Sequence, residues 1–140
     1  MTDTERSDGF DWVKARSECT LEKEFDRLAK AVQRDLERHN ALNPGIAQCQ
    51  TFHICCGDRF YIQRKGEHRV IFEMERGRIR IGRWARKGEH TPITDVTVRL
   101  DEEGQCILIG EDGRLWRPWQ IRRLALEETF FGESLLPETT

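Results

Sequence analysis

The stretch Arg69–Trp84, RVIFEMERGRIRIGRW, decides the fold of this chain. Apolar and polar residues alternate strictly on both sides of Arg76-Gly77, which is the pattern of half-buried strands. A two-residue turn at Arg76-Gly77 would join the two strands into a β-hairpin. The register set by this turn places two apolar pairs on the buried face, Phe72 with Ile81 and Met74 with Ile79.

The opposite face of the predicted hairpin carries charges. The same register puts Glu73 opposite Arg80 and Glu75 opposite Arg78. Opposite charges on directly facing residues stabilise a sheet, and like charges destabilise it. Because a slip of one residue would turn every side chain to the other face, the charged and apolar pairs together indicate one register.

A long amphipathic helix is predicted before the hairpin. Thr20 is a suitable N-cap, and the helix should run to about Asn40 and stop at Asn43-Pro44-Gly45. Its apolar residues recur at spacings of three and four: Leu21, Phe25, Leu28, Val32 and Leu36. Its other side is expected to face solvent, with Lys23, Asp26, Lys30, Arg34 and Glu37. A short helical segment at Trp12-Val13 is expected to pack beneath it.

Further strands follow in quick succession, at 48–56, 59–64, 93–100, 105–110 and 114–117. Their connections are too short for a parallel crossover, so neighbouring strands must be antiparallel. Side-chain alternation places Phe52 and Ile54 in the core, and a two-residue turn at Asp112-Gly113 would pair Ile109 with Trp116. A last helix is expected from Pro118, which suits the first helical position, to near Gly132.

The sequence therefore predicts an α+β fold: an N-terminal amphipathic helix, an antiparallel β-meander of about six to seven strands and a short C-terminal helix. We expect the first helix to cover one face of the sheet and the last helix to pack at an edge or at the open end. Two alternatives share this order of elements, a pleckstrin-homology-like bent sheet and a helix-grip-like sheet around a pocket. The single domain should span 11–132, between a disordered N-terminus (1–10) and a loose C-terminal tail (133–140).

Composition favours a cytoplasmic location. The chain has 140 residues, and no apolar run approaches the ~20 residues of a membrane helix, so no membrane partner is expected. Its polar first residues do not resemble a signal peptide. The five cysteines are an odd number without an export signal, so we expect reduced thiols and no disulfide.

Cys49, His53 and Cys55 form the densest group of metal-ligand residue types. Thiolate and imidazole suit Zn²⁺, but side chains along one strand are widely spaced for chelation. Small cysteines also pack well inside sheets. We therefore expect no cofactor, with zinc at these three residues as the alternative. No helix N-terminus follows the cysteines to lower a thiol pKa, which favours a binding domain over an enzyme.

Tryptophan and arginine, the residue types most enriched at binding hot spots, gather in two segments of the chain. They predict a partner-binding surface made of Arg83, Trp84, Arg86, Lys87, Trp116, Arg117 and Trp119. The competing interpretation is that the tryptophans close the core where the last helix docks. We expect a non-enzymatic binding or adaptor domain that acts through protein–protein contacts. A homodimer through the second sheet face, with Ile71, Cys106 and Leu108, is a further possibility.

Two other functions compete with protein binding. Basic residues outnumber acidic ones across 59–87 and Tyr61 lies among them, a combination found in single-strand nucleic-acid binders. The hairpin register neutralises part of this charge. The second alternative is a small-ligand pocket or enzyme site between helix and sheet, lined by His39, His90 or Cys106.

Overall fold

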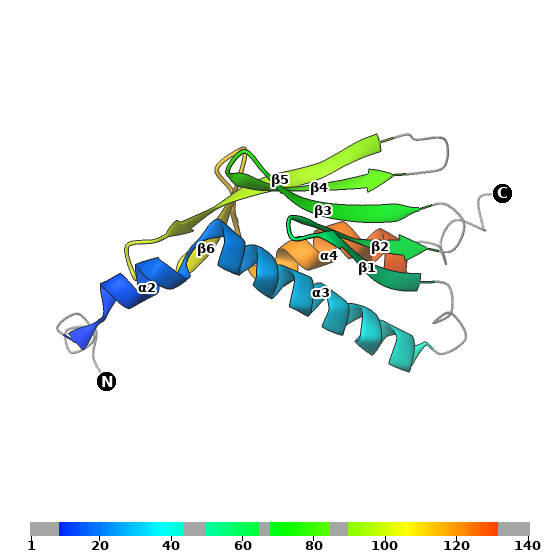
Figure 1. The fold of residues 1–140 in the computed structure, drawn as a ribbon, viewed down its shortest axis with the longest axis horizontal. Helices are drawn as coiled ribbons and strands as arrows, with labels where there is room; N and C mark the ends of the chain where they lie inside the picture. Colours follow the sequence, from blue (N-terminus) through cyan, green and yellow to red (C-terminus); the bar gives the residue numbers. More distant parts are fainter. Residues whose placement is uncertain (1–8, 44–49, 65–67, 85–89, 132–140) are drawn as a thin grey trace.

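A computed structural model of the chain describes residues 9–43, 50–64, 68–84 and 90–131. It has the predicted α+β architecture, with helices on either side of an antiparallel meander in the chain order (Figure 1). The helices are α2 (Trp12–Glu18), α3 (Leu21–Leu42) and α4 (Pro118–Phe130). The strands are β1 (Gln50–Cys56), β2 (Arg59–Arg64), β3 (Arg69–Glu75), β4 (Arg78–Trp84), β5 (His90–Leu100), β6 (Cys106–Gly110) and β7 (Leu115–Trp116). Within the described residues, no helix is both long and apolar enough to cross a membrane.

The seven strands form one sheet in which every strand pairs with its neighbours in the chain. The β3–β4 hairpin has the predicted register, with Phe72 opposite Ile81 and Glu73 opposite Arg80. Its two turn residues, Arg76 and Gly77, both have positive φ angles, 54° and 81°. Two positive φ values are what a type I′ turn requires, and this turn matches the natural twist of the flanking strands.

The core lies on one face of the sheet, and α3 and α4 both cover it (Figure 1). Inward side chains from neighbouring strands stack there, for example Phe60 on Phe72 at 4.6 Å between ring centroids. The expectation that the last helix packs at an edge or at the open end of the sheet is wrong, since α4 lies on β3 beside α3. The apolar side of α4 packs into the same core as α3, where Ile121, Ala125 and Leu126 are all buried.

α3 begins and ends close to its predicted limits. The Thr20 side chain accepts a hydrogen bond from the Lys23 backbone N–H at 3.2 Å, as an N-cap should. The short helix at Trp12 is also present, but it does not pack beneath α3. Trp12 and Val13 are 63% and 56% exposed, and α2 lies beside the far end of the β5–β6 hairpin, before the start of α3 (Figure 1).

Two contacts fasten the N-terminal segment to the β5–β6 hairpin. The Phe10 ring lies over Gly104 so closely that no Cβ atom would fit there. Cys19, just after α2, forms a disulfide with Cys106 at the start of β6. The expectation of reduced thiols is therefore wrong for this pair. The two cysteines are 87 residues apart, and no local pattern signals that the fold brings them together.

Strand β1 extends beyond the helical layer. Phe52 packs against the core as predicted, but Ile54 is 69% exposed, so its predicted core position is wrong. Alternation gives Ile54 the correct face, opposite the buried Phe60. Alternation cannot tell whether a helix covers that part of the face.

The β6–β7 connection differs by one residue from the prediction. The Gly110 N–H donates to the Arg114 carbonyl at 2.8 Å, which leaves a three-residue loop between them. Ile109 therefore pairs with Leu115, and Trp116 pairs with Leu108. Leu108 is buried in the core, so its predicted place on the second face is also wrong.

Polar side chains hold the C-terminal end of α4. The last carbonyl groups of a helix lack partners within it and need donors from elsewhere. The Gln50 side-chain amide donates to the Thr129 carbonyl at 3.1 Å, and His39 Nε2 lies 3.1 Å from the Phe130 carbonyl. The His39 ring also stacks on the Phe130 ring at 4.5 Å. These contacts join α4 to both β1 and α3.

The Phe10 contact can be measured with a pair of glycines. Gly104 and Gly113 share a φ of +85°, which strains any other residue, but only Gly104 has a ring above it. We expect Gly113→Ala to lower the free energy of unfolding by about 1–2 kcal/mol, and Gly104→Ala to lower it further. Urea denaturation of both variants measures this difference.

A double-mutant cycle tests whether Phe10 causes the larger loss of stability expected for Gly104→Ala than for Gly113→Ala. In a Phe10→Ala background, Gly104→Ala should cost no more than Gly113→Ala, since the ring that it displaces is gone. Equal costs for both glycine variants in the wild-type background would contradict the Phe10 anchor.

Candidate binding site

The predicted metal group is only partly present among the described residues. His53 Nε2 lies 2.7 Å from the Thr51 hydroxyl, and the His53 ring stacks on Tyr61 at 4.8 Å. Cys49 lies outside the described residues. Among the residues that are described, no group of three or more His, Cys, Asp or Glu side chains could hold a metal ion. Zinc at Cys49, His53 and Cys55 stays a prediction.

Cys55 and Cys56 are exposed thiols beside each other on β1, with their sulfur atoms 4.0 Å apart. The hydrogen bond with Cys55 raises the pKa of the Cys56 thiol, and the Cys55 charge raises this pKa further. A raised pKa reduces the fraction of thiolate, the nucleophilic form. The arrangement is therefore unsuited to cysteine catalysis through Cys56.

The predicted tryptophan–arginine surface is divided in the fold. Arg83 reaches across to α4, where it pairs with Glu128 at 3.0 Å. Trp84 lies at the end of β4 and contacts His90 in a tilted arrangement, with ring centroids 4.8 Å apart. Arg86 and Lys87 belong to a connection outside the described residues.

The other half of that surface lies at the opposite end of α4. Trp116 packs against the core, with the Arg114 guanidinium 4.0 Å from its ring centroid. Arg117 is the N-cap of α4, and Trp119 is 51% exposed. Trp119 and Glu128 are nine positions apart on α4, about 13 Å along its axis. Trp84 and Trp119 therefore belong to different surfaces.

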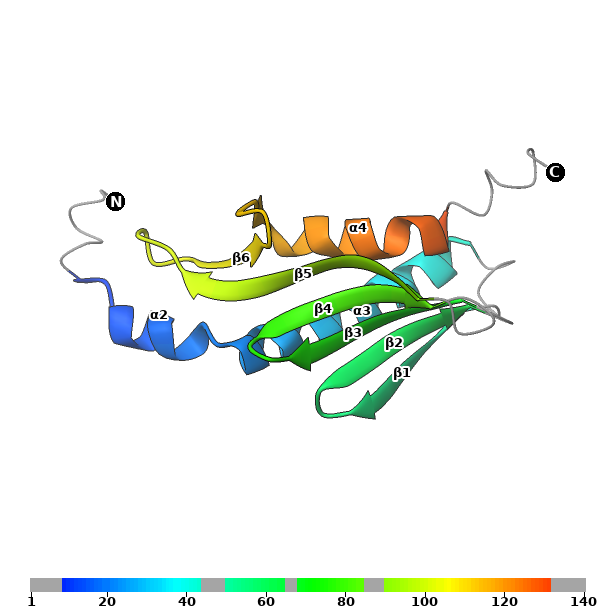
Figure 2. The ribbon, with the colours of Figure 1, turned by 90° about the horizontal axis from the view of Figure 1, so that it is seen from above.

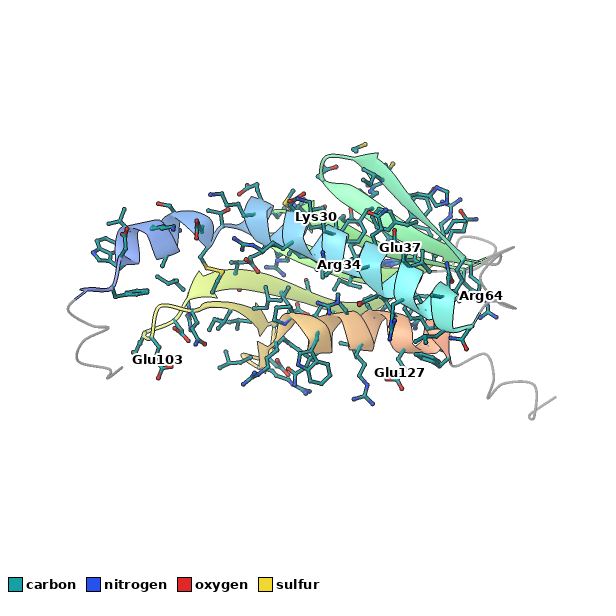
Figure 3. All side chains as sticks on the ribbon, turned by 90° about the horizontal axis from the view of Figure 1, so that it is seen from below. Lys30, Arg34, Glu37, Arg64, Glu103 and Glu127 are labelled. Carbon is teal, nitrogen blue, oxygen red and sulfur yellow. A yellow bond between two sulfur atoms is a disulfide. The ribbon has the colours of Figure 1, made fainter. Side chains whose placement is uncertain are left out.

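Trp119 borders a cleft between α3 and α4, which we call the interhelical cleft. The two helices lie side by side (Figure 3), and an ion pair from Arg122 to Asp35 at 2.6 Å spans the gap. On one side of this pair is a hollow of about 300 Å³, lined by Glu24, Arg27, Leu28, Lys30, Ala31, Arg34, Ile79, Leu108, Pro118 and Arg122. On the other side is an open groove of about 350 Å³, lined by Asp35, Trp119, Arg122, Arg123, Leu126, Glu127, Phe130 and Phe131.

The hollow combines an apolar floor with a basic rim. Leu28, Ile79 and Leu108 are core residues, so the hollow reaches the hydrophobic interior. Four cationic side chains stand on the rim, with Glu24 as the acidic member of the lining: Arg27, Lys30, Arg34 and Arg122.

Most of these cations already have an acidic neighbour. Arg27 pairs with Glu24, and Lys30 with Asp26 at 2.9 Å. Arg34 is exposed and has no ion-pair partner within the described part of the chain. Figure 3 shows Lys30 and Arg34 following one another along α3 on the side of the molecule where both helices are visible. Arg34 is thus the rim charge most available to a ligand.

The uncovered face of the sheet is closer to electrical neutrality than the sequence suggests. Three arginines of the basic stretch are paired with acids: Arg59 with Glu73, Arg78 with Asp95 and Arg80 with Glu75. The hydrogen bond from Arg80 to Glu75, 2.7 Å long, raises the pKa of Arg80. Arg69 lies over the Tyr61 ring at 4.9 Å. This face offers an anionic strand few unpaired cations.

Sequence reasoning identified Trp119 but missed the interhelical cleft. It treated Lys30 and Arg34 as ordinary solvated residues, because a helical pattern shows which face is polar and not what lies beside that face. The apolar floor comes from α3, β4 and β6 together. A signal was present in Arg34 and Arg122, which are basic residues on two helices that must cover the same sheet.

Comparisons of this chain with protein-family models, with curated proteins and with solved structures give no match.

The two tryptophans at the start of α4 should respond differently to truncation. Trp116 packs on the core, so we expect Trp116→Ala to lower the free energy of unfolding by about 2–4 kcal/mol. Trp119 is half-exposed, so Trp119→Ala should cost about 1 kcal/mol or less. Chemical denaturation measures both variants. An equal loss would make Trp119 a core residue and remove it from the cleft's binding surface.

Proposed function

We propose that this chain is a non-enzymatic binding domain that recognises a protein partner through the interhelical cleft. The partner is an amphipathic segment with an apolar side and acidic flanks. The observation that carries the proposal is the hollow of about 300 Å³, whose floor reaches core residues and whose rim is basic.

The chemistry of the cleft supports this choice of partner. Burying one large apolar side chain on the floor contributes about 1.5–3 kcal/mol. Arg34 gives a flat guanidinium that can hold a carboxylate through two parallel hydrogen bonds. Trp119, exposed beside the ion pair that divides the cleft, has the character of a hot-spot residue.

A small anionic amphiphile is the second candidate ligand. The hollow lies at the lower end of the ~300–1,000 Å³ range of small-molecule pockets. A short acyl chain could occupy the floor while its carboxylate meets Arg34. The same chemistry serves both ligands, so binding measurements with each must separate them.

Nucleic-acid binding stays a prediction with weaker support. Its original basis was the basic stretch at 59–87, and several of those arginines are held in ion pairs on the uncovered face. Affinity from the phosphate backbone depends on cations that are free to replace counterions.

Fluorescence anisotropy with two labelled model peptides tests the proposed function. Both are amphipathic helices of about 15 residues with leucines at helical spacing; one carries glutamates on its flanks and the other lysines. We expect the acidic peptide to bind and its affinity to fall as salt rises, because its charges meet the basic rim. The basic peptide should bind at least tenfold more weakly.

A matched pair of variants locates that binding. Arg34→Glu should weaken the acidic peptide at least fivefold, whereas Arg38→Glu should not, since Arg38 is an exposed α3 residue outside the cleft lining. Both substitutions change net charge equally. Equal losses in the two variants would contradict binding in the cleft. Saturable binding of a medium-chain fatty acid without peptide binding would favour the amphiphile.

A cytoplasmic location remains part of the proposal, and the Cys19–Cys106 disulfide bears against it. Cytosolic thiols are kept reduced, whereas disulfides persist in oxidising compartments. Thiol trapping in acid-quenched cells decides between a reducing and an oxidising compartment. In a cytosolic protein, Cys19 and Cys106 should be alkylated before any reductant is added. The exposed Cys55 and Cys56 are the internal control. Protection of Cys19 and Cys106 alone would place the protein in an oxidising compartment.

A further inference from the structure

The outer edge of β1 has no strand beside it among the described residues. β1 is the first strand of the sheet and pairs with β2 alone (Figure 2). A free edge presents backbone donors and acceptors that can pair with another strand. The β1–β2 hairpin (green) and α4 (orange) lie on opposite sides of α3, so a partner at this edge would leave the interhelical cleft accessible (Figure 3).

The hydrogen-bond pattern shows which backbone groups of β1 point outward. The Arg64 N–H donates to the His68 carbonyl, and the Met74 N–H donates to the Asp58 carbonyl. The backbone N–H and C=O groups of even-numbered residues from 58 to 64 therefore hydrogen-bond toward β3. Those of the odd-numbered residues between them, such as Tyr61, hydrogen-bond toward β1. Since Tyr61 is the direct partner of His53, the backbone N–H and C=O groups of His53 hydrogen-bond to β2 and not outward.

The two neighbours of His53 bond in the opposite direction. By the same alternation, the N–H and C=O groups of Phe52 and Ile54 point away from the sheet. The irregularity after Ile54 ends the regular edge at that residue.

Apart from the irregularity after Ile54, this edge lacks the usual protection against strand addition. Exposed edges commonly carry lysine, proline or inward-pointing charges. The β1 sequence, QTFHICC, has no charged residue, proline or glycine. The strand even exposes an aliphatic side chain, with Ile54 69% exposed on the helix-bearing face.

We infer that β1 is the homodimer interface of this chain, paired antiparallel with β1 of a second copy about a two-fold axis at His53. Phe52 of each copy then faces Ile54 of the other, and the outward N–H and C=O groups of these two residues bond across the axis. Each exposed Ile54 is covered by a Phe52 ring. The strand fits itself because it has no lysine, arginine, aspartate or glutamate, so pairing two copies sets no two of these charged side chains against each other.

Analytical ultracentrifugation over a concentration series tests this interface. The wild-type chain should show a monomer–dimer equilibrium. Ile54→Lys should weaken the dimer at least tenfold, since it places a cation against the partner's Phe52. Leu115→Lys is the matched control: Leu115 is 60% exposed, but lies on β7 at the opposite edge of the sheet. A monomer at all concentrations, or a dimer lost in the Leu115→Lys variant and not in the Ile54→Lys variant, would overturn the inference.

Disulfide trapping tests the register independently of dimer affinity. In a chain with Cys49→Ser, Cys55→Ser and Cys56→Ser, His53→Cys places two thiols at the axis. They form a non-hydrogen-bonded pair, whose side chains approach within about 4.5–5.5 Å. We expect a covalent dimer under mild oxidation, and little from Gln63→Cys on β2 in the same background. Equal crosslinking of the two would exclude pairing about His53.

Discussion

The fully buried apolar side chains of this sheet all face the side that the helices cover, and the rest of the structure depends on this constraint. The β3–β4 hairpin establishes it, because its type I′ turn fixes which residues face inward. Each later strand continues the same alternation, from Val96 on β5 to Leu108 on β6. Both long helices must then share one face, which is why α4 lies beside α3 and not at an edge.

Two helices are too narrow to cover seven strands. Neighbouring strands lie ~4.8 Å apart, so seven strands span about 29 Å. Two helices packed about 10 Å apart cover roughly 20 Å. The shortfall appears at two places: the exposed Ile54 at the edge of β1, and the cleft between α3 and α4 that the Asp35–Arg122 pair spans. The candidate cleft and the candidate interface therefore have one physical origin.

Local rules predicted what depends on local geometry. The Thr20 cap, the hairpin register and the order of the strands follow from spacing, turn chemistry and charge pairing, and all are present. The errors concern relations between distant segments. Ile54 is on the predicted face, but helix coverage ends before it. The Cys19–Cys106 bond depends on where α2 meets β6, which no local spacing encodes. The β6–β7 register failed because a three-residue loop replaced a two-residue one.

The candidate site was less predictable than the fold for the same reason. Residue type predicted Trp119, which is half-exposed, as part of a binding surface, yet grouped it with Trp84, which lies at the other end of α4 on another surface. Binding surfaces are made by elements that meet, and the floor of the cleft comes from α3, β4 and β6. The two candidate surfaces also bind by different means. The cleft would select its ligand by side-chain charge and apolar volume, whereas the β1 edge would pair through backbone groups and tolerate little charge. If both proposals hold, one domain would bind a second copy of itself and a separate ligand without competition between them.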